Sequence, residues 1–183
     1  LRMPRLFFAL PLHQLAPALI DWRERRPWPG LPVSERNLHL TLAFLGEADE
    51  ATRDRLIAAA AQQRCPPFSV HLDQTGWFQR ARAAWVGPSE WPNELNVLAR
   101  ALRRHGEKLG LGNGEQGYRP HVTLSRKAGE APEALPAPDL VLQADSFCLY
   151  QSVSTPQGVS YEPIACWPLR ARIKETNSEE LTP

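Results

Sequence analysis

Residues 37–46 alternate between large apolar side chains and smaller or polar ones, reading Asn-Leu-His-Leu-Thr-Leu-Ala-Phe-Leu-Gly. A period of two is typical of a β-strand with one buried face. The pattern predicts that His39 and Thr41 lie side by side on the face away from the core. The apolar residues predicted for the buried face are Leu38, Leu40, Leu42 and Phe44.

The same arrangement recurs in residues 119–126, which read Arg-Pro-His-Val-Thr-Leu-Ser-Arg. His121 and Thr123 share one face of this predicted strand, and Val122 and Leu124 share the other. The chain therefore carries two His-x-Thr-apolar tetrads, one in each half, and each is predicted to lie on a strand.

The rest of the hydrophobic pattern predicts further strands and three helices. Strands are expected at residues 5–10, 68–73, 83–87, 140–150 and 161–169. The second and third of these are expected to pair as a hairpin. Helices are expected over about residues 12–22, 50–63 and 92–109. Pro17 falls in the first turn of the first helix, where a missing N–H costs little. Asp49 is a suitable N-cap for the second.

This order of elements indicates an α+β fold with mostly antiparallel sheets. The two tetrads suggest two similar lobes that face each other across a cleft. A chain of 183 residues fits one domain of this kind, which we place at residues 1–172. Residues 173–183 are polar and are predicted to form a disordered tail.

Composition narrows the functional classes. With 43% hydrophobic residues, 22% charged residues and a net charge of +1, the chain resembles ordinary globular domains. Nothing in this balance demands nucleic-acid binding through bulk charge, so any RNA contact has to be local, although arginines cluster at residues 80–82 and 100–104. No stretch reaches the ~20 apolar residues of a membrane span. Pro11 interrupts the apolar run near the start, which argues against a signal peptide.

The three cysteines, Cys65, Cys148 and Cys166, are odd in number and show no short spacing. This pattern argues against a disulfide framework and against a zinc site. The simplest interpretation is that all three are reduced thiols in a cytoplasmic protein.

Two imidazoles and two hydroxyls that converge on one space can carry out acid–base chemistry. Histidines with a pKa near ~6.5 can act as base and acid in one turnover at neutral pH. Threonine hydroxyls can donate hydrogen bonds to anionic oxygens. If the tetrads face each other, the set suits a phosphodiester. One histidine would activate water, the other would protonate the leaving oxygen, and the threonines would bind the non-bridging oxygens.

Three other interpretations of the tetrads remain open. A metal site would lack a third protein ligand, because no carboxylate lies at a helpful spacing near either tetrad. Both histidines could instead be structural residues of the core. A nucleotide-binding module without catalysis would need the same hydrogen-bond donors but not two titratable groups.

The residues around the tetrads resemble those of a known group, the two-histidine (2H) phosphoesterase superfamily. Within it, the chain is similar to the bacterial and archaeal RNA 2′,3′-cyclic phosphodiesterases, also called LigT-like proteins or 2′-5′ RNA ligases. The resemblance covers about residues 5–169. The stretches that carry it are Arg5-Leu-Phe-Phe-Ala-Leu, residues 37–46, Ala84-Trp-Val-Gly, Pro120-His-Val-Thr-Leu-Ser-Arg and Tyr161-Glu-Pro-Ile.

The resemblance implies a bilobal fold with helices on the outer faces of two sheets, pseudo-two-fold symmetry and a central cleft. It implies metal-independent opening of a 2′,3′-cyclic phosphate to a 2′-phosphate, with no cofactor. RNA ends or nucleotides would be the substrates. It also allows 2′-5′ RNA ligation in the same site, because a 5′-hydroxyl can replace water as the nucleophile. A monomer without membrane contact is expected.

Carried over to this chain, the family's site residues are His39, Thr41, His121, Thr123 and Arg126. His39 would protonate the departing 3′ oxygen, and His121 would activate water. The two threonines would hold the phosphate oxygens. Arg126 follows His121 by five residues, so strict alternation places it on the opposite face. A bulge, a strand end or the reach of its side chain must bring it round.

Most of the aromatic side chains are interpreted as core residues; one of them could stack on the base of the substrate, but the sequence does not select it. The candidates are Phe7, Phe44, Trp77, Phe78, Trp85, Tyr161 and Trp167. The other three histidines, His13, His71 and His105, stand alone and are interpreted as structural or solvated.

Overall fold

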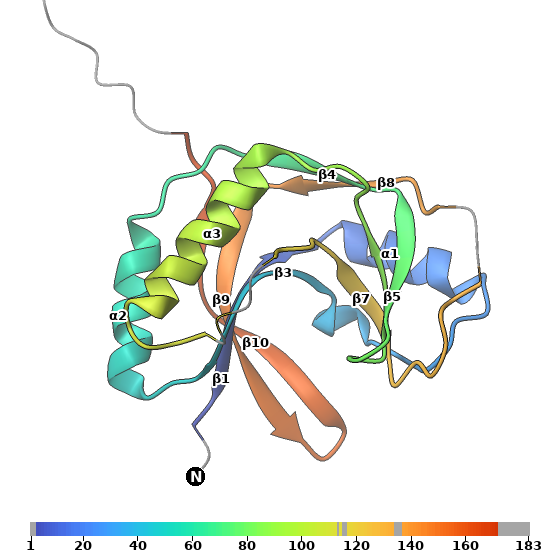
Figure 1. Ribbon diagram of the computed structural model, residues 1–183, viewed down its shortest axis with the longest axis horizontal. Helices are drawn as coiled ribbons and strands as arrows, with labels where there is room; N and C mark the ends of the chain where they lie inside the picture. Colours follow the sequence, from blue (N-terminus) through green and yellow to red (C-terminus); the bar gives the residue numbers. More distant parts are fainter. Residues whose placement is uncertain (1–2, 113, 115–116, 134–136, 172–183) are drawn as a thin grey trace, which may run out of the picture.

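A computed structural model describes residues 3–112, 114, 117–133 and 137–171 (Figure 1). Its strands are β1 (Arg5–Pro11), β2 (Leu31–Pro32), β3 (His39–Glu47), β4 (Phe68–Leu72), β5 (Gln74–Phe78), β6 (Ala83–Gly87), β7 (Val122–Arg126), β8 (Leu140–Ala144), β9 (Ser146–Thr155) and β10 (Gly158–Pro168). Its helices are α1 (Leu15–Glu24), α2 (Glu50–Ala61), α3 (Asn93–Glu107) and the short 3-10 helix η1 (Glu35–Asn37).

The strands form two antiparallel sheets, so the predicted α+β class is confirmed. The larger sheet has eight strands in the order β10-β9-β1-β3-β7-β6-β5, with β2 paired to β7. The smaller sheet pairs β4 with β8. Both tetrads lie in the larger sheet, where β3 and β7 are neighbours at its centre.

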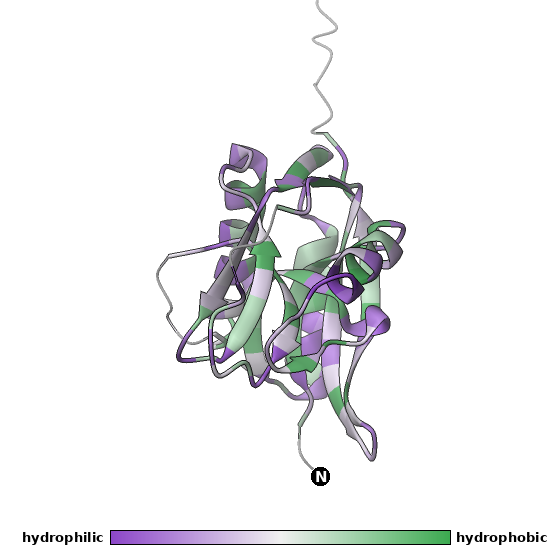
Figure 2. Cartoon of the chain, turned by 90° about the vertical axis from the view of Figure 1, so that its right-hand side faces the viewer, coloured by the Kyte–Doolittle hydropathy of each residue, from purple (hydrophilic) through white to green (hydrophobic). Residues whose placement is uncertain are grey.

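The core lies on one face of the larger sheet. Leu40 and Val122 are fully buried there, and the buried stripe of α3, which packs on β3, meets them. Helices α2 and α3 lie together on one side of the molecule and α1 lies on the other (Figure 1). Hydrophobic and hydrophilic residues alternate along the strands, and the helices carry many hydrophilic residues (Figure 2). One face of β3 and β7 is thus anchored, which leaves the other available for a site.

The predicted helices are confirmed, with shifts at their ends. The Asp49 carboxylate accepts a hydrogen bond from the Thr52 amide at 2.8 Å and caps α2, as expected. The first helix continues to Glu24, and its Arg23 is buried instead of lying in a loop. The Arg23 guanidinium donates to the carbonyls of Val33 and Leu124, both at 2.8 Å. Arg23 therefore ties the end of α1 to β7.

The predicted hairpin between residues 68–73 and 83–87 is wrong. β6 pairs with β5, whereas β4 pairs with the distant β8. β5 contains Gly76, which weakens the strand pattern in the sequence. Gly76 lies opposite Trp85, and a Cβ there would come within 2.1 Å of the Trp85 ring. The indole thus occupies the space that a side chain would need, and only glycine fits.

The prediction that Phe44 lies in the buried layer is also wrong, because 49% of its side chain is exposed. The β1–β3 register shifts between Phe8 and Ala9, which face Ala43 and Thr41. Leu42 is the extra residue of a β-bulge, which reverses the alternation beyond it. Leu42 and Ala43 are both buried, and Phe44 turns to the face that carries Thr41.

The expectation of three reduced cysteines is wrong for one pair. β9 and β10 form a long hairpin in which Cys148 lies directly opposite Cys166, with Cα atoms 4.1 Å apart, and the two form a disulfide. The odd count hid this pair, because only the register of the hairpin brings the two thiols together. Cys65 is free and buried, and burial raises the pKa of its thiol to about 11.

No helix in the described part of the chain is long and apolar enough to span a membrane. The tail predicted at residues 173–183 lies outside the described residues.

The close approach at Gly76 yields a stability prediction. Gly76→Ala should lower the free energy of unfolding by about 1–3 kcal/mol, because the new methyl group overlaps the Trp85 ring. Urea denaturation measures the change. Gly129→Ala is the control, since its nearest neighbour would be an Arg82 nitrogen at an ordinary 3.6 Å. Equal stability of the two variants would contradict the packing described for Trp85.

Candidate active site

The two tetrads meet at one residue pair. β3 and β7 are antiparallel, and their register pairs Leu40 with Val122. Facing residues of an antiparallel pair point to the same side. Since Leu40 and Val122 both point into the core, their neighbours all point to the opposite face. These neighbours are His39, Thr41, His121 and Thr123.

The pairing also creates local pseudo-two-fold symmetry. A rotation about the midpoint of Leu40 and Val122 exchanges His39 with His121, and it exchanges the two threonines. The histidines are therefore diagonal neighbours, which an ideal sheet places about 7–8 Å apart, with their Cβ atoms somewhat closer. In the described residues neither threonine hydroxyl has a hydrogen-bond partner. The centre of this face thus presents two rings and two unoccupied hydroxyls.

Both imidazoles are held in the same way. Nδ1 of His39 donates to the Asn37 carbonyl at 2.8 Å, and Nδ1 of His121 donates to the Arg119 carbonyl at 2.9 Å. A carbonyl can only accept, so the neutral rings carry their proton on Nδ1. The lone pair of each neutral ring is then on Nε2, where it can take a proton from a reactant.

Aromatic side chains fix the His39 ring. Its centroid lies 4.9 Å from that of Phe7 and 5.1 Å from that of Tyr161, which meets it edge-on. Tyr150 stacks on Phe7 at 5.3 Å. These residues come from β1, β9 and β10, and the strand registers place them on the same face as His39.

A matching pair of aromatic rings holds His121. Phe78 meets the His121 ring edge-on with centroids 4.8 Å apart, and Trp85 lies 6.0 Å away. The Arg119 guanidinium sits over the Trp85 ring at 4.9 Å. Both histidines are thus locked by apolar rings on one side and by a carbonyl on the other.

Arg126 lies on the histidine face, which resolves the difficulty posed by strict alternation. The β6–β7 register shifts between Ala84 and Trp85, which face Ser125 and Thr123, so Leu124 is the extra residue of a bulge. Leu124 and Ser125 are both buried, and Arg126 turns to the face of Thr123.

A tyrosine and the end of the first helix support this arrangement. Arg126 Nη2 donates to the Tyr161 hydroxyl at 2.7 Å, and its guanidinium lies 5.8 Å from the centroid of that ring. The Leu124 carbonyl at the bulge accepts hydrogen bonds from Arg23 and from the Val33 amide. Arg126 is therefore held beside the ring that packs on His39.

Burial and positive charge keep both rings neutral. Burial lowers the pKa of His39 from 6.5 to about 4; the hydrogen bond to Asn37 opposes this shift, and the charges of Arg126 and His121 add to it. Burial also lowers the pKa of His121, against the hydrogen bond to Arg119, and the charges of Arg119 and Arg126 lower it further. The site is thus a cationic, partly desolvated space that favours a bound anion.

The two strands continue the symmetry beyond the tetrads. Each histidine is followed by a bulge, and five residues after it stands Phe44 in β3 and Arg126 in β7. Phe44 and Phe78 line a groove of about 620 Å³ that begins at Thr41 and His121. The groove is also lined by Arg80, Arg103, Tyr118 and Arg119. Aromatic faces and guanidiniums therefore flank the histidine pair on this side.

Asn37 is a site-supporting residue that sequence analysis missed. Its carbonyl holds His39, while its side chain donates to the Val159 carbonyl at 2.8 Å and accepts from the Tyr161 amide at 3.1 Å. It thus couples the His39 ring to the strand that carries Tyr161. Its position two residues before His39, where Arg119 stands before His121, is the signal that could have revealed it.

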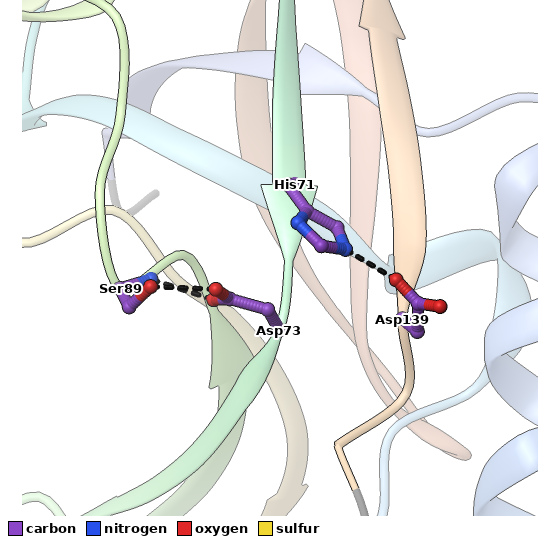
Figure 3. Close-up of polar contacts among 4 residues, drawn as sticks. All are labelled: His71, Asp73, Ser89 and Asp139. Atoms are coloured by element: carbon purple, nitrogen blue, oxygen red, sulfur yellow. Dashed lines mark hydrogen bonds and ion pairs between the residues drawn. The ribbon is translucent and has the colours of Figure 1, made fainter.

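His71 and His105 lie outside this site, as expected. His71 projects from β4 and pairs with Asp139 at 2.5 Å, beside an Asp73 carboxylate that accepts two hydrogen bonds from Ser89 (Figure 3). His105 contacts the Gln63 side chain at 3.0 Å. Among the described residues, no group of three or more histidine, cysteine, aspartate or glutamate side chains could hold a metal ion.

The lowered pKa of His39 yields a pH-dependent stability. Below pH 6.5 the unfolded chain protonates His39, whereas the folded chain does not until about pH 4. Folded wild type should lose about 3 kcal/mol of its free energy of unfolding over this window, and His39→Gln should not show this loss. Urea denaturation at several pH values measures the difference between the two proteins. Parallel curves for both would contradict the burial of a neutral His39.

Comparison with known proteins agrees with this geometry. The model of the 2′-5′ RNA ligase superfamily matches residues 11–155. The RNA 2′,3′-cyclic phosphodiesterase of Escherichia coli is 36% identical over 170 residues, covering 90% of this chain and 96% of the relative. That of Thermus thermophilus is 33% identical over 181 residues, which cover 91% of this chain and 90% of the relative. The crystal structure of E. coli LigT complexed with 3′-AMP superposes with a TM-score of 0.85 at 35% identity, covering 91% of this chain and 98% of that one. The chain belongs to the 2′-5′ RNA ligase superfamily.

Proposed function

We propose that this protein hydrolyses RNA or nucleotide 2′,3′-cyclic phosphates to 2′-phosphates by two-histidine acid–base catalysis without a metal. The observation that carries the proposal is the Leu40–Val122 pairing, which brings both imidazoles and both threonines to one face. The names of the relatives support the reaction class. This reaction would make the protein a phosphoric diester hydrolase.

The roles follow from what each side chain can do. His121 accepts a proton from water through Nε2, since its Nδ1 is engaged with Arg119. His39 donates a proton to the departing 3′ oxygen. Its Nδ1 is engaged with the Asn37 carbonyl, so Nε2 is the atom that donates. One ring on each side of the phosphorus atom suits an in-line displacement, in which nucleophile and leaving group lie opposite each other.

The anionic substrate completes the proton balance. His39 must be protonated to act as an acid, yet burial holds its pKa at about 4 in the free protein. A bound phosphodiester places a negative charge beside the ring, which raises the pKa of His39. Binding of the substrate therefore loads the acid, and a neutral ligand would not.

Thr41, Thr123 and Arg126 bind the non-bridging oxygens. Both hydroxyls lie on the histidine face, and Arg126 can donate to an oxygen while Tyr161 steadies its guanidinium. Such fixed donors stabilise the charge that develops in the transition state. The nucleoside occupies the groove beyond Thr41, where the exposed Phe44 and the half-buried Phe78 offer faces for the base. We further infer a monomer that uses no cofactor.

Role assignment can be tested with two variants and two substrates. His39→Ala and His121→Ala should each lower kcat on a ribonucleoside 2′,3′-cyclic phosphate by about 10²–10⁴-fold, with a smaller effect on substrate affinity. A nitrophenyl phosphodiester, whose leaving group needs no proton, should partly rescue His39→Ala and not His121→Ala. Rescue of the His121 variant alone would reverse the roles. Equal loss of affinity with kcat unchanged would favour a binding module without catalysis.

Independence from metal has its own test. The cyclic phosphate should be opened at an unchanged rate in excess EDTA, because the two imidazoles and Arg126 supply the acid, the base and the positive charge. The rate is measured before and after dialysis against the chelator. Activity that is lost on dialysis and restored by zinc or manganese would overturn the two-histidine mechanism.

A second activity, 2′-5′ RNA ligation, is favoured by one observation. Another hollow of about 640 Å³ lies on the far side of Tyr161, lined also by Leu38 and Tyr150. Tyr150 and Tyr161, which line it, lie 6.3 and 5.1 Å from the His39 ring, so it offers room near that ring for a second RNA end whose 5′-hydroxyl replaces water. Water is in vast excess in dilute solution, so hydrolysis should dominate there.

A further inference from the structure

A smaller hollow adjoins the groove that we assign to the nucleoside. Its volume is about 280 Å³. It shares four lining residues with the groove, so the two form one continuous depression leading away from His121. The shared residues are Leu42, Arg103, Gly117 and Tyr118, and those found only in the smaller hollow are Asn96, Ala99 and Arg100.

One stripe of α3 forms the polar wall of this hollow. Asn96, Arg100 and Arg103 follow each other at spacings of four and three, so they lie on one face of the helix. The adjacent face, with Leu95, Leu98 and Leu102, is fully buried and packs on β3. The wall therefore has a fixed position relative to the strand that carries His39 and Thr41.

The hollow presents donors for an anion. Arg100 and Arg103 bring two guanidiniums to it. The Asn96 side-chain oxygen accepts from Trp91 Nε1 at 2.8 Å, which leaves the amide nitrogen as a donor. On the floor, the Tyr118 hydroxyl donates to the Thr41 carbonyl at 2.8 Å. This hydrogen bond links the hollow to the first tetrad.

Charge is concentrated along this path. The groove contributes Arg80 and Arg119, so guanidiniums line the depression from the histidines to Arg100. Glu107 lies 3.7 Å from Arg103, one turn further on. Both side chains of that ion pair are at least 36% exposed, so water and salt screen it. With a net charge of only +1 for the whole chain, this is a local basic surface.

We propose that the Asn96–Arg100–Arg103 wall binds the phosphodiester on the 5′ side of the terminal nucleotide, so that the enzyme acts on oligonucleotide ends in preference to free cyclic nucleotides. The inference rests on the proposed function of the histidine site. In a single strand the next phosphate lies one nucleotide from the terminal phosphate. A basic groove with aromatic faces that tracks this backbone is typical of single-strand binding.

The test compares two substrates in the full-length protein. One is a nucleoside 2′,3′-cyclic phosphate, and the other is a trinucleotide that ends in the same cyclic phosphate. Arg100→Glu should lower kcat/KM for the trinucleotide by about 10-fold or more, the effect of losing a hydrogen bond to a charged group. Hydrolysis of the mononucleotide should be unchanged, because Arg100 lies outside the nucleoside groove.

Salt dependence separates a phosphate contact from a general effect. The slope of log kcat/KM against log salt for the trinucleotide should become shallower by about 0.7 in the variant, as expected for one lost contact to a single strand. Arg104→Glu is the matched control, since Arg104 is exposed on the same helix but lines neither hollow. It should reproduce the wild-type preference for the trinucleotide.

Binding of an uncleaved ligand keeps this inference independent of the chemistry. The affinity for a trinucleotide 2′-phosphate is measured beside that for a nucleoside 2′-phosphate. Loss of affinity for the trinucleotide alone in Arg100→Glu supports the wall as a phosphate site, even if neither cyclic phosphate is hydrolysed and the proposed function fails. Equal effects of Arg100→Glu on both ligands, or no effect on either, would overturn the inference.

Discussion

A single antiparallel pairing, Leu40 with Val122, positions the chemistry of this protein. Both side chains are fully buried, and their burial orients the residues on either side of them. A slip of one residue in either strand would turn its histidine into the core and its apolar neighbour into the groove. The hydrophobic layer beneath the site is therefore what selects the register, and the register is what brings the two imidazoles together.

Two β-bulges extend this arrangement beyond the tetrads. A regular strand would bury the residue five positions after each histidine, yet Phe44 and Arg126 both lie on the histidine face because Leu42 and Leu124 are extra residues. The two strands thus have symmetric backbones, but the side chains at the equivalent positions differ in chemistry. One half offers a flat apolar ring and the other offers a cation, in keeping with a substrate that has a base at one end and a phosphate at the other.

Local pattern was enough to predict the tetrads, the faces of His39 and His121, and the Asp49 cap of α2, because each depends on neighbours in sequence. Features that depend on distant strands were not predictable. Gly76 obscured β5, whose partner is β6, and the register of β9 with β10 decides that Cys148 meets Cys166. The side chain of Asn37 reaches β10 from η1, and no periodicity reports such a contact.

The packing of Trp85 has a consequence for how the protein can be observed. Its indole lies 6.0 Å from the His121 ring, under the Arg119 guanidinium and above Gly76. In the described part of the chain it is the only tryptophan ring in contact with either of the two histidines. Indole fluorescence is quenched by a nearby protonated imidazole and responds to a charge in a poorly hydrated space. The emission of Trp85 is therefore an intrinsic optical signal of the protonation state of His121 and of the arrival of an anion beside it.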